Sequence, residues 1–325
     1  MPLIRMLCLL LLAGLTVVSA GNPIPVILDT DIGDDIDDAL ALALALQSPE
    51  LDVRAVVTVL QHRERRADLC WRILELYNRT DIPVGMGAEQ PLLTKPRTGP
   101  VRQTEALDPE MRMPDAKRRN GIRLMIDTIL SSSEKVTVVA YGPLTNVAVA
   151  LKAEPRIESK IERLVLMNGL FFTRIGVEYN TLRDPEAAAI VFGSGLPIVV
   201  VGLDVTMQCR LSPEDMRRFD SSTLPNVQFL RRLIRIWQDG DDDRMPVLHD
   251  PLSVAVTFRP ELIRPLVGRV EVETRGEPGR TYGMTIFRSD ANGLVQVAKE
   301  VEAPQFVSLF MERLVSAPRT SSSSR

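Results

Sequence analysis

Residues 29–38 carry a dense group of carboxylates, which are Asp29, Asp31, Asp34, Asp35, Asp37 and Asp38. No lysine or arginine occurs between Asp29 and Gln47. Carboxylates brought close together raise one another's pKa and repel unless a cation or hydrogen-bond donors compensate. An all-oxygen ligand set selects calcium or magnesium. The spacing therefore predicts a divalent-cation site, and a solvated acidic turn is the alternative interpretation.

The segments on either side of these aspartates determine where such a site would lie. An apolar run at 25–28 predicts a strand before them. The run 39–46 alternates Leu and Ala with a period of two, yet it has no β-branched residue and consists of the strongest helix formers. We therefore expect a helix with Asp37 and Asp38 in its first turn, where the helix dipole favours anions. The leucines form two adjacent stripes, which predicts burial on most of the helix circumference.

The rest of the chain alternates short β-branched runs with helical stretches, as in a parallel sheet covered by helices. The predicted strands are residues 25–28, 53–59, 136–140, 163–167 and 198–201. Asp184 and Pro185, with Gly193 further on, predict a helix between them. The predicted fold class is α/β, a mostly parallel, doubly wound open sheet flanked by helices. The acidic stretch then follows the carboxyl end of the first strand, where open α/β sheets bind ligands.

Composition and the chain ends limit the class of protein. The chain has 325 residues, 45% of them hydrophobic, and a pI near 5.7 with no basic run, which argues against a nucleic-acid partner. Residues 1–20 combine Arg5, an apolar run and a small-residue site, which predicts a signal peptide cleaved after Ala20. A retained membrane anchor is the alternative. We expect an exported protein, periplasmic or secreted, with one domain over 21–318, a disordered tail at 319–325 and no stable membrane anchor.

Several motifs together resemble one enzyme family. Asp-Thr-Asp-x-Gly at 29–33, followed by Asp-Asp-Ala-Leu at 37–40, is similar to the metal loop of the inosine-uridine nucleoside hydrolases. Further similar segments occur in the same order at 141–146, 165–169, 178–180, 184–188 and 249–252. The order and rough spacing match over most of residues 24–300. The resemblance implies calcium-dependent hydrolysis of the N-glycosidic bond of a ribonucleoside, which gives free base and ribose, and a homo-oligomeric assembly.

The resemblance also implies a role for each matching residue. The implied ligands of Ca²⁺ are the side chains of Asp31, Asp38 and Asp250 and the carbonyl oxygen of Tyr141. Asp31 would take a proton from a metal-bound water, whose pKa the cation lowers. Residue His249 would approach the leaving base. The implied substrate contacts are Asp37, Met167, Glu178 and Asn180, with Asn168 as a further candidate.

This sequence departs from the family pattern in its sugar-binding segments. Two extra residues separate Gly33 from the Asp-Asp pair, so that Asp35 could take the role given to Asp37. Gln61 and His62 stand where family members often have Gly-Asn, whose asparagine contacts the sugar; His62 is therefore another candidate substrate contact. Metal ligation is predicted to be intact and sugar recognition to be altered.

Simpler interpretations exist for individual motifs. Asp250 before Pro251 could be an ordinary helix N-cap. Glu178 and Asn180 could form an exposed turn, although on an extended segment they would face the same way. The run 239–244 is expected to be a solvated loop, in a place that permits a lid.

Two other functions remain open at this point. A magnesium-dependent phosphohydrolase would also begin with a strand and Asp-x-Asp, but it would need a lysine near the acidic stretch, for which Lys135 and Lys152 are the candidates. A nucleoside- or sugar-binding homologue that has lost turnover would keep the metal ligands.

Overall fold

The computed structural model describes residues 22–95, 99–173, 176–278 and 280–315. The predicted signal peptide at 1–20 and the predicted tail at 319–325 lie outside the described residues. Within the described ranges, no helix combines the length and the apolar character needed to cross a bilayer. Cys70 and Cys209 are buried free thiols.

The described residues form a ten-stranded sheet with the order β4-β3-β2-β1-β5-β6-β7-β10-β8-β9. Pairing is parallel from β4 to β10 and antiparallel for β10–β8 and β8–β9, so the fold class predicted above is confirmed. The strands are β1 Ile24–Thr30, β2 Leu51–Thr58, β3 Val84–Met86, β4 Arg118–Asn120, β5 Val136–Ala140, β6 Ile161–Met167, β7 Ile198–Val201, β8 Ile263–Val272, β9 Thr285–Ser289 and β10 Val295–Val301. All five predicted strands are therefore present.

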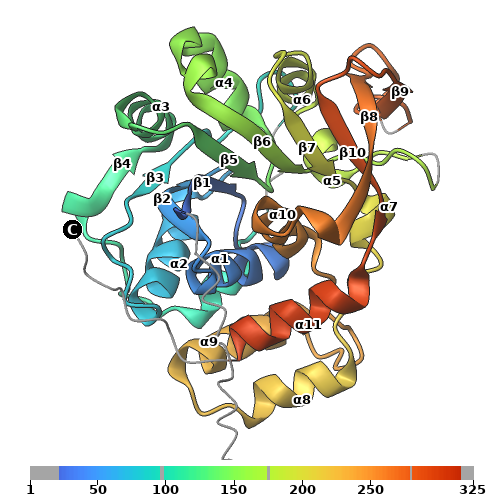
Figure 1. The fold of residues 1–325 in the computed structure, drawn as a ribbon. Coiled ribbons are helices and arrows are strands. Elements are labelled where there is room, and N and C mark those ends of the chain that lie inside the picture. Colours follow the sequence, from blue (N-terminus) through green and yellow to red (C-terminus); the bar gives the residue numbers. More distant parts are fainter. Residues whose placement is uncertain (1–21, 96–98, 174–175, 279, 316–325) are drawn as a thin grey trace, which may run out of the picture.

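Helices cover both faces of the sheet (Figure 1). One face packs against α3 Gly121–Ser131, α4 Thr145–Ala153 and α6 Pro185–Phe192. The other face packs against α1 Asp37–Gln47, α2 Arg63–Leu76 and α10 His249–Phe258, with α9 Pro225–Gln238 and α11 Ala303–Leu314 further out. Short helices α5 Tyr179–Arg183, α7 Leu203–Thr206 and α8 Pro213–Ser221 lie in the connections. Two hydrophobic cores, one on each face, result from this arrangement.

Helix α1, which follows the acidic residues, is buried along its whole length. Every residue from Asp37 to Gln47 is buried, which confirms the burial expected from its two leucine stripes. Helix α6 also forms as predicted: the Asp184 carboxylate accepts a hydrogen bond from the Ala187 N–H at 3.1 Å, and Gly193 follows the last turn. These two helices are therefore fixed by local sequence as well as by packing.

The strand order reverses next to β1, because the chain continues to β2 on one side and to β5 on the other. In open α/β sheets a ligand site forms in the crevice outside the carboxyl ends of the strands at this switch point. The loops that follow β1, β5 and β6 meet there, and the N-terminus of α10 lies beside α1. The fold thus places the acidic segment at the expected position.

Candidate active site

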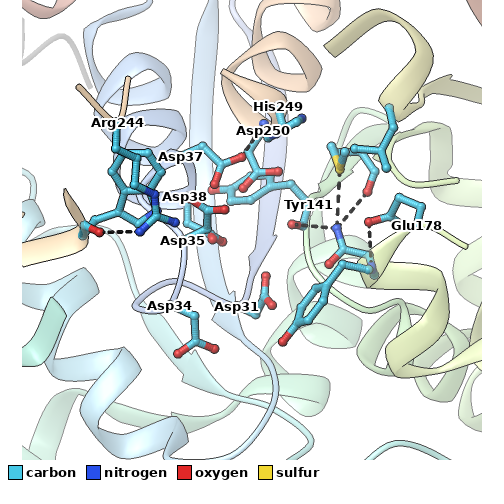
Figure 2. A pocket seen from close by; sticks show the side chains of 15 residues that line it. Asp31, Asp34, Asp35, Asp37, Asp38, Tyr141, Glu178, Arg244, His249 and Asp250 are labelled. Carbon is cyan, nitrogen blue, oxygen red and sulfur yellow. Dashed lines mark hydrogen bonds between the residues drawn. The ribbon is translucent and has the colours of Figure 1, made fainter. Parts of the chain in front are cut away.

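A cavity of about 330 Å³ lies at this edge of the sheet (Figure 2). Its lining residues are Asp31, Asp34, Asp35, Asp37, Asp38, Tyr141, Met167, Glu178, Tyr179, Asn180, Leu203, Trp237, Arg244, His249 and Asp250. Of the residues to which the family resemblance gives a ligand, proton-transfer or substrate role, all but Asn168 and His62 are in this lining. Segments more than 200 residues apart in the chain therefore converge as the resemblance implied.

Three buried carboxylates form the centre of the cavity. Asp37 and Asp38 begin α1, Asp250 lies in the first turn of α10, and one oxygen of each lies within 4.8 Å of the others. The Asp250 N–H donates to the Asp37 carboxylate at 3.2 Å, and the Thr30 hydroxyl donates to Asp38 at 2.6 Å. Two helix N-termini, each favourable to anions, therefore face one another across the cluster. Asp31 lines the same cavity outside this group of three.

The N-cap interpretation of Asp250 is wrong. Helix α10 begins at His249, its cap position is Leu248, and no side chain caps it. The Asp250 side chain instead points toward Asp37 and Asp38, as Figure 2 shows. A buried carboxylate inside the first turn, without a local capping bond, is thus available for the cavity.

Burial and mutual repulsion raise the pKa of the clustered carboxyl groups. Desolvation is the largest cause for Asp37, Asp38 and Asp250, and their pKa values lie well above the ordinary value for aspartate. Desolvation likewise raises the pKa of Asp31 to about 7, while the nearby Arg66 guanidinium lowers it. Both burial and mutual repulsion make the ionised form of these carboxyl groups unfavourable. Such a cluster therefore indicates a binding site for a cation.

Glu178 and Asn180 line the side of the cavity next to β6. The Glu178 carboxylate caps α5 and accepts hydrogen bonds from the N–H groups of Asn180 at 2.6 Å and Thr181 at 2.9 Å. The Asn180 amide donates to the carbonyl oxygens of Tyr141 at 3.3 Å and Met167 at 3.1 Å. The segment is extended only at Glu178, which caps α5, because Asn180 lies in the first turn of that helix. The exposed-turn alternative is wrong, since both side chains are buried.

Two predicted substrate contacts lie outside the cavity lining. Asn168 is fully buried, and its side-chain amide oxygen accepts a hydrogen bond from the Thr181 hydroxyl at 2.7 Å. His62 is exposed and precedes α2 with a φ of 61°, in the left-handed region. In this structure Asn168 contacts α5 through Thr181, and His62 is not among the residues that line the cavity.

The remaining wall contains an imidazole and an aromatic–cation pair. The Thr206 hydroxyl lies 2.7 Å from Nδ1 of His249, and burial lowers the pKa of this histidine although the Asp35 carboxylate opposes the effect. The Arg244 guanidinium stacks 3.8 Å from the centre of the Trp237 ring. The run 239–244 is exposed, as expected for a solvated loop, yet its Arg244 also reaches the cavity.

Sequence reasoning missed some lining residues, which are Asp34, Tyr179, Leu203, Trp237 and Arg244. Asp34 and Tyr179 are direct neighbours of predicted residues and could have been found by extending those motifs. Trp237 lies in the last turn of α9 and belongs to none of the motifs singled out from the sequence. The two candidate lysines of a phosphohydrolase are not in the lining: Lys135 lies near Glu162 at the other end of β5, and Lys152 is exposed on α4.

The chain belongs to the inosine-uridine preferring nucleoside hydrolase family, which it matches over residues 26–308, and is therefore an enzyme that hydrolyses N-glycosyl bonds. The pyrimidine-specific ribonucleoside hydrolase RihA of Shigella boydii is 38% identical over 309 residues, which cover 90% of this chain and 98% of that protein. RihA of Escherichia coli O7:K1 is also 38% identical, over 311 residues with the same coverage.

Solved structures of nucleoside hydrolases have the same fold. The plant nucleoside hydrolase PpNRh1 superposes with a TM-score of 0.80 at 28% identity and covers 90% of this chain and 99% of its own. The purine-preferring ribonucleoside hydrolase of Gardnerella vaginalis has a TM-score of 0.77 at 27% identity, with 90% and 98% covered. Family membership confirms the resemblance and the assignment as a hydrolase of ribonucleoside N-glycosidic bonds.

Proposed function

We propose that this enzyme is a calcium-dependent hydrolase that acts on pyrimidine ribonucleosides and releases free base and ribose. The observation that carries the metal requirement is the convergence of Asp37, Asp38 and Asp250 in a buried cavity. The preference for pyrimidines is supported by the 38% identity to relatives named as pyrimidine-specific. A cavity of about 330 Å³ is at the lower end of the range for sites that hold one small molecule, roughly 300–1,000 Å³.

The donor set fits calcium. Calcium–oxygen distances of about 2.3–2.6 Å allow two ligands of one ion to lie up to about 5 Å apart. The three clustered carboxylates, with oxygens within 4.8 Å of one another, satisfy that limit. Asp38 and Asp250 belong both to this cluster and to the ligand set that the family resemblance implies. Asp31 and Asp37 are the alternatives for the third carboxylate, and the Tyr141 carbonyl oxygen is a further candidate ligand.

The cavity residues can perform the remaining steps. Bond cleavage leaves an oxocarbenium-like ribosyl group, whose positive charge the surrounding carboxylates stabilise. Calcium, when bound, would polarise the attacking water and the ribose hydroxyls. The Asp31 carboxylate, which lines the cavity, would accept a proton from the attacking water. Glu178 and Asn180 can accept hydrogen bonds from ribose hydroxyls, Asn180 through its side-chain amide oxygen, because its amide nitrogen already donates to Tyr141 and Met167. Because Thr206 occupies Nδ1 of His249, Nε2 is the nitrogen that can contact the leaving base.

A nucleoside panel tests the proposal. Free base and free ribose would be measured for uridine, cytidine, inosine and adenosine, with calcium and with a chelator. We expect equal amounts of base and ribose from the pyrimidine nucleosides, reversible loss of activity on chelation, and activity reduced about 10³-fold or more in Asp31→Asn. Faster turnover of the purine nucleosides would refute the substrate class, and full activity in the chelator would refute the metal requirement.

Asp31→Asn and Asp37→Asn also distinguish the two candidate ligand sets. Calorimetric titration with calcium should show the larger loss of affinity in the variant that removes a ligand. A variant that keeps calcium affinity but loses turnover identifies the proton acceptor instead.

We also propose that the chain is exported and assembles as a homo-oligomer. The signal-peptide pattern at 1–20 supports export, and N-terminal sequencing of the mature protein should begin at Gly21. An intact Met1 on protein recovered from the cytoplasmic fraction would refute it. Light scattering of the purified protein at several concentrations tests the assembly.

A further inference from the structure

Arg66 contacts the acidic loop, residues 31–36, from outside the cavity. It lies in the first turn of α2, and its side chain is 3% exposed. The Nη1 atom donates to the carbonyl oxygens of Asp31 and Ile32, the latter at 2.9 Å. The Nη2 atom donates to the Asp34 carboxylate at 2.8 Å. Arg66 does not line the cavity, so these contacts act on the loop without occupying the site.

The guanidinium is itself fixed in place. Its Nε atom donates to the Gln61 carbonyl oxygen at 2.8 Å, so all three nitrogens have acceptors. On the other side of the loop, Gln103 donates from its backbone N–H to the Gly33 carbonyl oxygen at 3.1 Å and from its side-chain amide to the Asp35 carbonyl oxygen. The loop is thus clamped between α2 and the segment that carries Gln103, although the two lie far from it in sequence.

The charge of Arg66 allows two roles to be distinguished, which are positioning of the acidic loop and electrostatic compensation of its carboxylates. A positive group close to a calcium site repels the ion, and the repulsion is strong in a buried environment. Removing that charge should therefore tighten calcium binding if electrostatics alone mattered. Planar guanidinium contacts to two carbonyl groups and one carboxylate instead fix backbone geometry, which a lysine cannot reproduce.

We propose that Arg66 is a positioning residue, which holds the acidic loop in the arrangement needed for ion binding and for proton transfer at Asp31. The proposed effect of Arg66 on calcium binding rests on the proposed function. Its proposed effect on the geometry of the loop concerns the metal-free chain and does not depend on that function. The loop is two residues longer than the pattern it resembles, and Arg66 pairs with Asp34, one of the residues in that longer stretch.

The variants are Arg66→Gln and Arg66→Lys, with Arg72→Gln as the matched control. Arg72 lies on the same helix, is 41% exposed and pairs with Glu75 at 3.1 Å. Hydrogen exchange of the amides in 31–36 is measured on metal-free protein. Calcium dissociation constants are measured by calorimetry, and kcat and KM at saturating calcium.

We expect amide exchange in 31–36 to be at least about 10-fold faster in both Arg66 variants and unchanged in Arg72→Gln. Calcium binding should weaken about 10- to 100-fold in Arg66→Gln, the usual effect of losing a residue that orients ligands. The value of kcat should fall more than KM rises. Should Arg66→Gln not fold, Arg66→Lys alone decides the question.

Two results would overturn the inference. One is unchanged exchange in 31–36 in the variants. The other is calcium binding that is equal or tighter in Arg66→Gln with kcat preserved, because Arg66 would then serve only as a countercharge. A wild-type protein that binds no calcium would refute the proposed metal requirement, whereas the exchange experiment on metal-free protein would still test the positioning role.

Discussion

Removing the metal should make the stability of this enzyme strongly dependent on pH. Burial raises the pKa of Asp29 and of Asp31 from 3.8 to about 7 in the folded protein. A carboxyl group with a raised folded pKa contributes full stability below its unfolded pKa, and this contribution is lost as the pH rises through the folded pKa. The metal-free protein should therefore lose stability between about pH 5 and about pH 8.

The size of this loss follows from the two pKa values. For each carboxyl group the unfolded chain is already ionised at about pH 5, so the folded state loses about 2–3 kcal/mol between about pH 5 and about pH 8. Asp29 and Asp31 together give about 5 kcal/mol. For 325 residues the entropy of unfolding is roughly 0.7 kcal/mol/K, so that about 5 kcal/mol corresponds to a fall in Tm of roughly 7 °C. Bound calcium stabilises ionised carboxylates, so the loss at Asp31 should largely disappear when calcium is present.

Thermal unfolding at a series of pH values, with calcium and with a chelator, measures the effect. Asp29→Asn is the informative variant, because Asp29 is fully buried, lies outside the cavity lining and bonds to the Asn146 amide at 2.7 Å. It should remove the contribution of Asp29, about 2–3 kcal/mol, from the pH-dependent loss in metal-free protein. Asp127→Asn, at a side chain that is 51% exposed, is the control and should change nothing. A metal-free Tm that stays constant over this pH range would refute the reasoning.

Two further substitutions test the loop and the leaving-group side. Gly33→Ala should destabilise the protein by about 2–5 kcal/mol, because φ is +123° and a Cβ would lie 2.1 Å from Val101 Cγ1; Gly195→Ala, with φ +78° and open space, should cost only about 1 kcal/mol in the same melts. Thr206→Val removes the partner of His249 Nδ1 and should lower kcat for uridine about 10-fold. Turnover of a para-nitrophenyl riboside, whose leaving group needs little assistance, should stay the same, and an equal loss on both substrates would contradict the role of His249.

Much of the fold could be predicted because local patterns and tertiary packing agree. The five predicted strands contain β-branched runs, and the Leu-Ala run of α1 was predicted to be a buried helix because it has no β-branched residue. The short parallel strands β3 and β4, the parallel strand β10 and the antiparallel strands β8 and β9 were not predicted. Val267, Arg269 and Glu271 of β8 are exposed on one side, so this strand lacks the continuous apolar character of the parallel ones.

Site residues that belong to one motif could be predicted together. Site residues that are far apart in the sequence and meet only in the fold were harder to predict. Asp37 and Asp38 come from a single loop, and the sequence places Asp250 there only through the family resemblance. The contact of Arg66 with the acidic loop could not be predicted. The sequence shows that residues 29–47 contain no basic residue, but it does not show that a basic side chain of α2 packs against them. His62 shows the converse: it matches a sugar-binding position by order in the chain, but it is exposed and is not among the residues that line the cavity.

These long-range contacts explain how a chain can keep so many buried carboxylates in one place. Asp37 and Asp38 start α1, whose leucines anchor it in the core, and Asp250 starts α10, which packs along α1. The repulsion between the carboxylates acts to separate two helices that hydrophobic burial holds together. Because the helices cannot move apart without exposing the core, relief has to come from protonation or from a bound cation. The same packing that makes the metal-free site unfavourable would therefore favour the proposed cation between the two helix ends.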